Sequence, residues 1–147
     1  MSGGELTYTR VHRATPELLF DCMTTPEHLT RFWGPAGTTT PVDAITIDLR
    51  PGGAFETTMV NDADGEEYVM RAVFVEIDPP GRLVFKAADG DMTTTITFTE
   101  LGEGRCEVVT HQTNVPPMFS TDESLAGFET SLDRSDAYIA ALAATRG

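Results

Sequence analysis

A single long amphipathic segment near the C-terminus constrains the possible folds of this chain more than any other feature. Its apolar side chains recur three and four residues apart, at Leu125, Phe128, Leu132, Ile139 and Leu142. That spacing predicts an α-helix with one apolar face, and Ser135 is the one polar member of the stripe. Because Ser120 and Glu123 resemble a capping box, we expect the helix to begin near Ser120.

The middle of the chain has the pattern of β-strands separated by turns. Strands are expected at six ranges, which are Val42–Leu49, Ala54–Val60, Glu66–Asp78, Arg82–Lys86, Thr93–Glu100 and Arg105–Thr113. In the fifth of these, Ile96 and Phe98 alternate with threonines, which predicts an apolar inner face and a threonine-rich outer face.

The N-terminal part predicts one strand and two short helices. Leu6–Arg13 has strand-forming Thr and Tyr residues. Thr15-Pro16-Glu17 and Thr25-Pro26-Glu27 are the same helix-start signal, with a capping Thr, a Pro at the first helical position and a Glu in the first turn. The second helix is expected to carry Leu29, Phe32 and Trp33 and to stop at Gly34-Pro35.

This order of elements predicts an α+β fold. The chain of 147 residues fits a single domain spanning residues 1–147. One long helix cannot cover a six- or seven-stranded antiparallel sheet completely, so we expect the sheet to curve around the helix. The space between helix, short helices and concave face is a usual setting for an apolar ligand pocket.

Composition excludes several classes of partner. The net charge is −13 and no basic cluster occurs, which argues against nucleic acid and against insertion into an anionic membrane. Two distant cysteines, no leader-like N-terminus and no long apolar run favour a cytoplasmic protein. His12, His28 and His111 lie on separate elements without metal-ligand spacing, so neither a metal nor a cofactor is expected.

Several short motifs, in order, resemble those of one superfamily. They are Thr25–Leu29 with Phe32–Pro35, Asp48–Gly53 with Phe55 and Met59, Glu76–Phe85, Phe98–Glu100, Gly104–His111, and Gly127-Phe128 with Leu132. Together they resemble the START-like (SRPBCC) superfamily, in the branch related to the activator of the heat-shock protein 90 ATPase. The likeness extends from about Tyr8 to Leu142.

The resemblance implies a helix-grip fold and a cavity for hydrophobic or aromatic molecules. It leaves the function open, because relatives include lipid carriers, hormone receptors, polyketide cyclases and co-chaperone domains. The chain departs from the family pattern at Phe128, where a Trp is frequent, and at Ser135, where an apolar residue is usual. Both changes would alter the size or polarity of the pocket.

Aromatic and sulfur-containing side chains are the candidate lining of the pocket. On the short helix these are Phe32 and Trp33, and on the strands they are Phe55, Met59, Met70, Phe74, Phe85 and Phe98. The long helix adds Phe128, Leu132 and Ser135. Each aromatic residue could instead fill the core. Ser135 could bind a ligand or bond to a carbonyl one turn back.

Met118 and Phe119 precede the long helix in a Pro-rich loop. They could form a lid over the pocket, or a hydrophobic staple at the start of the helix.

Glu107 and His111 are the polar candidates. Alternation places them with Val109 on one face of their strand, and composition would put the opposite face, with Cys106 and Val108, inside. The family resemblance instead implies that Val109 and His111 face inward. On that basis we expect Glu107 and His111 to form a polar end of the pocket, with an exposed His111 as the alternative.

Three functions remain possible from the sequence. The first is binding of a small hydrophobic or aromatic molecule in an internal cavity. The second is a cyclase- or hydrolase-like enzyme in which His111 or Glu107 moves a proton. The third is a co-chaperone-like regulator of the heat-shock protein 90 ATPase, although no feature of the chain supports that partner. An exposed edge strand would also permit a homodimer.

Overall fold

Helices and strands follow one another in nearly the predicted order. The computed structural model describes residues 4–88, 90–117 and 121–146. Its helices are α1 (Pro16–Thr24), α2 (Pro26–Leu29), the short 3-10 turn η1 (Val42–Ala44) and α3 (Asp122–Arg146). Its strands are β1 (Gly4–His12), β2 (Thr38–Thr39), β3 (Ile45–Ile47), β4 (Ala54–Asn61), β5 (Glu67–Asp78), β6 (Arg82–Ala87), β7 (Thr93–Gly102) and β8 (Arg105–Val115).

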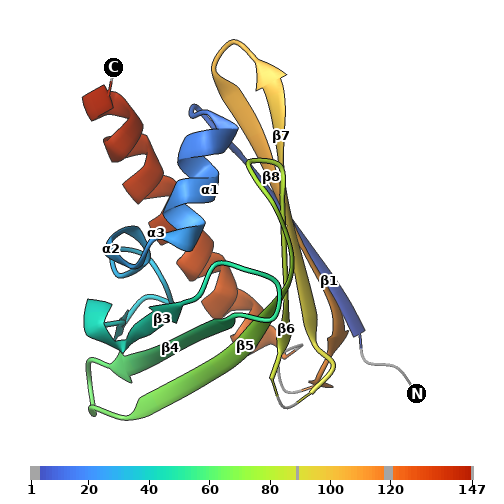
Figure 1. Ribbon diagram of the computed structural model, residues 1–147. Coiled ribbons are helices and arrows are strands. Elements are labelled where there is room, and N and C mark those ends of the chain that lie inside the picture. Colours follow the sequence, from blue (N-terminus) through green and yellow to red (C-terminus); the bar gives the residue numbers. More distant parts are fainter. Residues whose placement is uncertain (1–3, 89, 118–120, 147) are drawn as a thin grey trace.

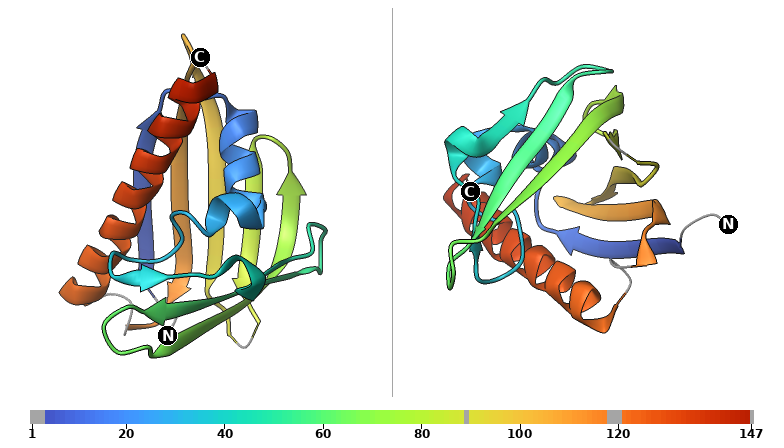
Figure 2. Two further views of the ribbon diagram at one scale, coloured as in Figure 1. Left: turned by 90° about the vertical axis from the view of Figure 1, so that its left-hand side faces the viewer. Right: turned by 90° about the horizontal axis from the view of Figure 1, so that it is seen from below.

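The strands form one curved antiparallel sheet. Its order is β1-β8-β7-β6-β5-β4-β2, with β3 also paired to β4, which makes eight strands. All three α-helices lie on the concave side of the sheet (Figures 1 and 2). The predicted α+β helix-grip architecture is therefore confirmed. The described sheet has one strand more than the six or seven expected, because the two-residue β2 carries no strand pattern of its own.

Alternation assigns each strand an inner and an outer face. Tyr8, Arg10 and His12 pair with Thr110, Val108 and Cys106 across β1 and β8. Cys106 and Thr110 are buried, which places this set on the concave side. In β7, Ile96 and Phe98 are buried on the same side, so the predicted inner and outer faces of that strand are confirmed.

The two helix-start signals act differently. The hydroxyl of Thr15 accepts a hydrogen bond from the Leu18 amide at 3.2 Å and caps α1 as predicted. The hydroxyl of Thr25 instead donates to the Asp21 carboxylate at 2.9 Å and makes no cap. The second helix also ends earlier than expected, at Leu29, and the chain continues to Trp33 through turns.

The range expected as one strand over residues 42–49 is divided. Ala44 donates its amide to the Pro41 carbonyl at 2.9 Å, which closes η1 and leaves only Ile45–Ile47 for β3. The predicted start of α3 at Ser120 lies outside the described residues. Within them, Thr121 is the residue before α3, and its hydroxyl accepts a hydrogen bond from the Ser124 amide at 3.1 Å.

Phenylalanines dominate the core beneath the concave face. Phe55 stacks on Phe74 with ring centroids 5.4 Å apart and meets Phe85 edge-on at 5.0 Å. Phe20 from α1 contacts Phe98 of β7 at 5.8 Å. Such contacts contribute beyond the burial of apolar area, and they fix α1 against the middle of the sheet.

Burial along α3 is uneven. Ile139 is 4% exposed and belongs to the core, and Tyr138, Leu142 and Ala143 pack against that core. By contrast, Phe128 and Leu132 in the first half of the helix are only half-buried. No helix in the described part of the chain is long and apolar enough to cross a membrane.

Candidate ligand-binding site

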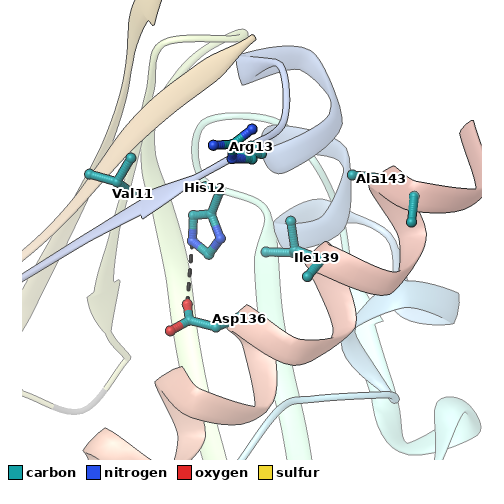
Figure 3. A pocket seen from close by; sticks show the side chains of 8 residues that line it. Val11, His12, Arg13, Asp136, Ile139 and Ala143 are labelled. Carbon is teal, nitrogen blue, oxygen red and sulfur yellow. Dashed lines mark ion pairs between the residues drawn. The ribbon is translucent and has the colours of Figure 1, made fainter. Parts of the chain in front are cut away.

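A groove of about 500 Å³ lies where the end of β1 meets the C-terminal half of α3 (Figure 3). Its lining residues are Val11, His12, Arg13, Asp136, Ile139, Ala140, Ala143 and Ala144. Most of them are apolar, and the polar members come from two elements that are far apart in sequence. The groove therefore exists only once β1 and α3 are folded together.

Local sequence explains why space remains at this place. The side of α3 that borders the groove carries alanines at positions 140, 143 and 144. A methyl group reaches less far than the larger apolar side chains earlier in α3, so the helix and the strand cannot close over the gap. On β1, alternation turns His12 toward α3 and Val11 toward the other face of the strand (Figure 3).

Charged groups lie along one side of the groove. The Arg10 guanidinium donates to Asp136 at 2.7 Å and to Asp133 at 3.0 Å, and both carboxylates lie on α3. The bond to Asp133 is the main cause of a raised pKa at Arg10. His12 Nε2 lies 3.6 Å from the Asp136 carboxylate.

Burial favours the neutral form of His12. This residue is 8% exposed, and loss of water around the ring lowers its pKa from the ordinary value of 6.5. The negative charge of Asp136 opposes this effect, whereas the positive charge of Arg10 adds to it. A neutral imidazole keeps one nitrogen as a hydrogen-bond acceptor and one as a donor.

Polar contacts hold the rest of α3 against the loops. Arg134 Nη1 lies 2.8 Å from the carbonyl oxygen of Gly34, 2.9 Å from that of Pro35 and 3.3 Å from that of Thr38. The Tyr138 hydroxyl is 2.6 Å from His28 Nδ1. Sequence reasoning did not single out Arg134, because nothing in the helical pattern marks which exposed-face arginine will meet a loop.

The inner face of β1 and β8 also carries an unusual polar group. The Tyr8 hydroxyl is buried and has no hydrogen-bond partner among the described residues. The centroid of its ring lies 4.5 Å from the centroid of the Phe128 ring of α3. Burial, and then the negative charge of Glu129, raise the pKa of Tyr8.

The predicted pocket residues lie mainly in the core. Phe32, Phe55, Phe74, Phe85 and Phe98 are buried members of one cluster. Trp33 and Met70 pack against that cluster, and the Trp33 indole donates to the Thr57 hydroxyl at 3.1 Å.

Four further members of the predicted set also lie outside the lining of the groove. Met59, Phe128, Leu132 and Ser135 are half-buried. Met118 and Phe119 lie outside the described residues. A ligand site formed by this set stays a prediction.

The prediction that Glu107 and His111 line the pocket is wrong. Cys106, Thr110 and Gln112 are buried on the inner face of β8, so Glu107, Val109 and His111, which alternate with that face, point outward. His111 Nε2 lies 2.9 Å from the Glu5 carboxylate, and its side chain is 41% exposed. Composition alone indicated the correct inner face of β8. That face carries Cys106 and Val108, whereas the opposite face would have required burial of the Glu107 charge.

A second groove, of about 330 Å³, lies against α1. It is lined by Glu17, Phe20, Asp21, Thr24, Leu49, Pro79 and Pro80. Among residues 4–88, 90–117 and 121–146, no group of three His, Cys, Asp or Glu side chains could hold a metal ion.

Comparison with known families identifies the fold's relatives. Residues 13–140 match the family AHSA1, described as activator of Hsp90 ATPase homolog 1-like protein. This match covers well over half of the chain. The chain belongs to the AHSA1 family.

Solved structures of AHSA1-like folds resemble the chain over most of its length. A protein from Chromobacterium violaceum is 25% identical, with a TM-score of 0.84, over 92% of this chain and 97% of its own. The AHSA1 protein from Silicibacter pomeroyi is 23% identical, with a TM-score of 0.74, over 91% and 96%. An HSP90 activator from Plasmodium falciparum is 22% identical, with a TM-score of 0.63, over 88% of each chain. No match was found among curated proteins.

Two AHSA1-like motifs have structural roles in this chain. Gly34 and Pro35 are the residues whose carbonyl oxygens Arg134 contacts. Gly53 lies so close to the preceding turn that an added Cβ would meet the Asp48 carbonyl oxygen at 2.0 Å, so only glycine fits.

Proposed function

We propose that the protein binds a small, mostly apolar molecule between α3 and the sheet, in the groove beside β1. The observation that carries this proposal is the groove itself, whose volume of about 500 Å³ lies within the range of about 300–1,000 Å³ typical of ligand pockets. Ile139 and the alanines of α3 supply apolar walls, and His12 and Asp136 supply the few polar groups that fix a ligand's orientation.

The site differs from the internal cavity expected from the sequence. The phenylalanines that were expected to surround an empty space contact one another instead. The open volume is found at the edge of the helix, where alanines replace the larger side chains of its first half.

Thermal shift measurements with a panel of apolar small molecules test this proposal. A ligand at about 100 times its Kd stabilises the folded state by about 2.7 kcal/mol, which gives a measurable rise in Tm. Ala140→Phe places a ring in the groove and should abolish the rise. Ala141→Phe is the matched control, because Ala141 is also exposed on α3 but does not border the groove.

The outcome that contradicts the proposal is equally specific. If ligands raise the Tm of the wild type and of Ala140→Phe by the same amount, the groove beside β1 is not where they bind. If no ligand class raises the Tm of the wild type, the chain is not a carrier of small apolar molecules.

A second candidate function is proton transfer on a bound substrate. It is favoured by the neutral His12 imidazole 3.6 Å from a carboxylate in the groove, since general acid–base catalysis needs a positioned group of this kind. The expected signature is turnover of a bound carbonyl compound that His12→Gln eliminates without loss of binding. Glu107 and His111 no longer support such chemistry, because they lie on the outer face.

A third candidate is action on the Hsp90 ATPase, which rests on the description of the family and on the relative from Plasmodium falciparum. The likeness to that relative is one of fold. An ATPase assay of purified Hsp90 with and without this chain tests it, and an unchanged rate would eliminate it.

A further inference from the structure

The His12 side chain has unused hydrogen-bonding capacity that faces the groove. His12 is 8% exposed, and its Nε2 atom lies 3.6 Å from the Asp136 carboxylate, which is longer than a hydrogen bond. Within the part of the chain that the structure describes, neither ring nitrogen makes a hydrogen bond. The ring nitrogens are not among the fully buried side-chain atoms without a partner in the described residues, so they are reached from the groove. A polar group in the groove, from water or from a ligand, can therefore bond to this imidazole.

The charges around His12 restrict that group. Asp136 and Asp133 both lie on the facing side of α3, and Arg10 is already engaged by both of them. A ligand carboxylate at this end would be buried beside Asp136 in a chain of net charge −13. A ligand cation would compete with Arg10 for the same carboxylate. Burial of either ion is costly unless it gains a well-placed partner.

An uncharged hydroxyl avoids both penalties. It can donate to the neutral His12 nitrogen or to the Asp136 carboxylate, and its oxygen can accept from the imidazole N–H. The opposite wall, formed by Ile139 and the alanines of α3, is suited to an apolar ring or short alkyl chain.

Taking the proposed binding function as given, we propose that the ligand of this groove is a phenol or alcohol whose hydroxyl bonds to His12 and Asp136 while its hydrocarbon body lies against α3. Arg13 also borders the groove and is exposed, so an anionic ligand is the competing class that the experiment must separate.

Three matched probes separate these classes: 4-propylphenol, propylbenzene and 4-propylbenzoate. Each is titrated into the full chain and followed by two-dimensional NMR of the backbone amides and of the histidine rings. We expect 4-propylphenol to shift the amides of Ala140 and Ala143 and the His12 ring. It should bind roughly three- to tenfold more tightly than propylbenzene, the factor that one hydrogen bond supplies.

Substitutions test the assignment of the hydroxyl partner. His12→Phe keeps a buried ring of similar size and should remove the preference for the phenol while propylbenzene still binds. Asp136→Asn keeps the shape of that side chain and should reduce the preference. His111→Phe is the matched control, because His111 lies on the outer face of β8 and should change nothing.

The outcomes distinguish failure of the inference from failure of the function. Tighter binding of 4-propylbenzoate would assign the groove to anions at Arg13, and equal binding of all three probes would remove any role for the hydroxyl. Either result overturns the inference and leaves the binding function intact. If no probe shifts the groove amides, the inference and the binding function fail together.

Discussion

At the scale of single residues, the polar groups under the sheet are the clearest departures from ordinary packing. Tyr8 has a buried hydroxyl without a partner among the described residues, and His12 is a buried histidine, with its pKa lowered by burial, beside a charged pair. Both lie on the inner face of β1, which is the strand nearest to α3. Among the described residues, the Tyr8 hydroxyl and the groove-facing ring of His12 thus lie at the junction between helix and sheet, where a ligand could bond to them.

Removal of the Tyr8 hydroxyl should not destabilise the protein. A buried polar group without a partner costs roughly 1–3 kcal/mol, so Tyr8→Phe should leave the free energy of unfolding unchanged or raise it by about 1 kcal/mol. Urea denaturation measures the difference. A loss of more than about 1 kcal/mol would mean that the hydroxyl has a partner in solution, such as a bound water.

Acid should destabilise the protein through His12. Burial lowers the pKa of His12 from 6.5 in the unfolded chain, so as the pH falls below 6.5 the unfolded state takes up a proton before the folded state does. The free energy of unfolding is therefore greatest above pH 6.5, and it decreases with falling pH until the pKa of the folded state is passed.

The control for this effect is a variant that cannot titrate. We expect His12→Phe to lose less stability than the wild type when urea denaturation is compared at about pH 7.5 and about pH 5.5. His111→Phe, on the outer face, should not reproduce that effect. Equal pH dependence of wild type and His12→Phe would show that the ring is solvated in solution.

At the scale of elements, α3 is attached to the rest of the protein by polar contacts as well as by its apolar face. Arg134 joins it to the loop between α2 and β2, Arg10 joins it to β1, and Tyr138 joins it to α2. The first half of the helix is only half-buried, so these polar contacts add to the burial of its second half in holding α3 over the concave face.

Loss of Arg134 should loosen that attachment. One guanidinium nitrogen contacts three carbonyl groups, and hydrogen bonds to a charged group contribute roughly 1.5–3 kcal/mol. We expect Arg134→Ala to lower the free energy of unfolding by about 2 kcal/mol and to speed hydrogen exchange in the loop at residues 34–38. Arg105→Ala, at an exposed position of β8, is the control and should change the stability by less than about 0.5 kcal/mol.

At the scale of the whole molecule, the curved sheet and its helices enclose a core of phenylalanines, and open volume is found at the edges of that core. Phe55 is fully buried at its centre, between Phe74, Phe85 and Trp33. The sequence analysis placed the same residue in the lining of a pocket. The effect of truncating Phe55 on stability and on ligand binding therefore distinguishes a core role from a pocket role.

Truncation of Phe55 should therefore cost stability. A core phenylalanine replaced by alanine typically destabilises a protein by about 3–5 kcal/mol, and we expect a value in that range for Phe55→Ala by urea denaturation. Ligand binding in the groove beside β1 should persist under conditions where the variant stays folded. If Phe55→Ala lowers the free energy of unfolding by less than about 1 kcal/mol and also abolishes ligand binding, Phe55 belongs to the ligand site and not to the core.

The main elements and the architecture follow from patterns in the sequence. The repeat of three and four residues in α3, the alternation in β7 and the Thr-Pro-Glu start of α1 are local patterns, and local patterns reflect burial on one face. Composition also identified the buried face of β8, while the family resemblance favoured the opposite one. Short elements such as β2 and the split range around η1 were missed, because two or three residues carry no periodicity.

The position of the candidate site depends on how segments far apart in the sequence pack together. His12 and Asp136 are separated by most of the chain, and no pattern within either segment indicates that the two side chains meet. The same holds for Arg134 and the carbonyl oxygens of Gly34 and Pro35. A groove is the space left between elements after they pack, so it depends on the angle and register of β1 against α3, and these are set by contacts across the whole core rather than by neighbouring residues.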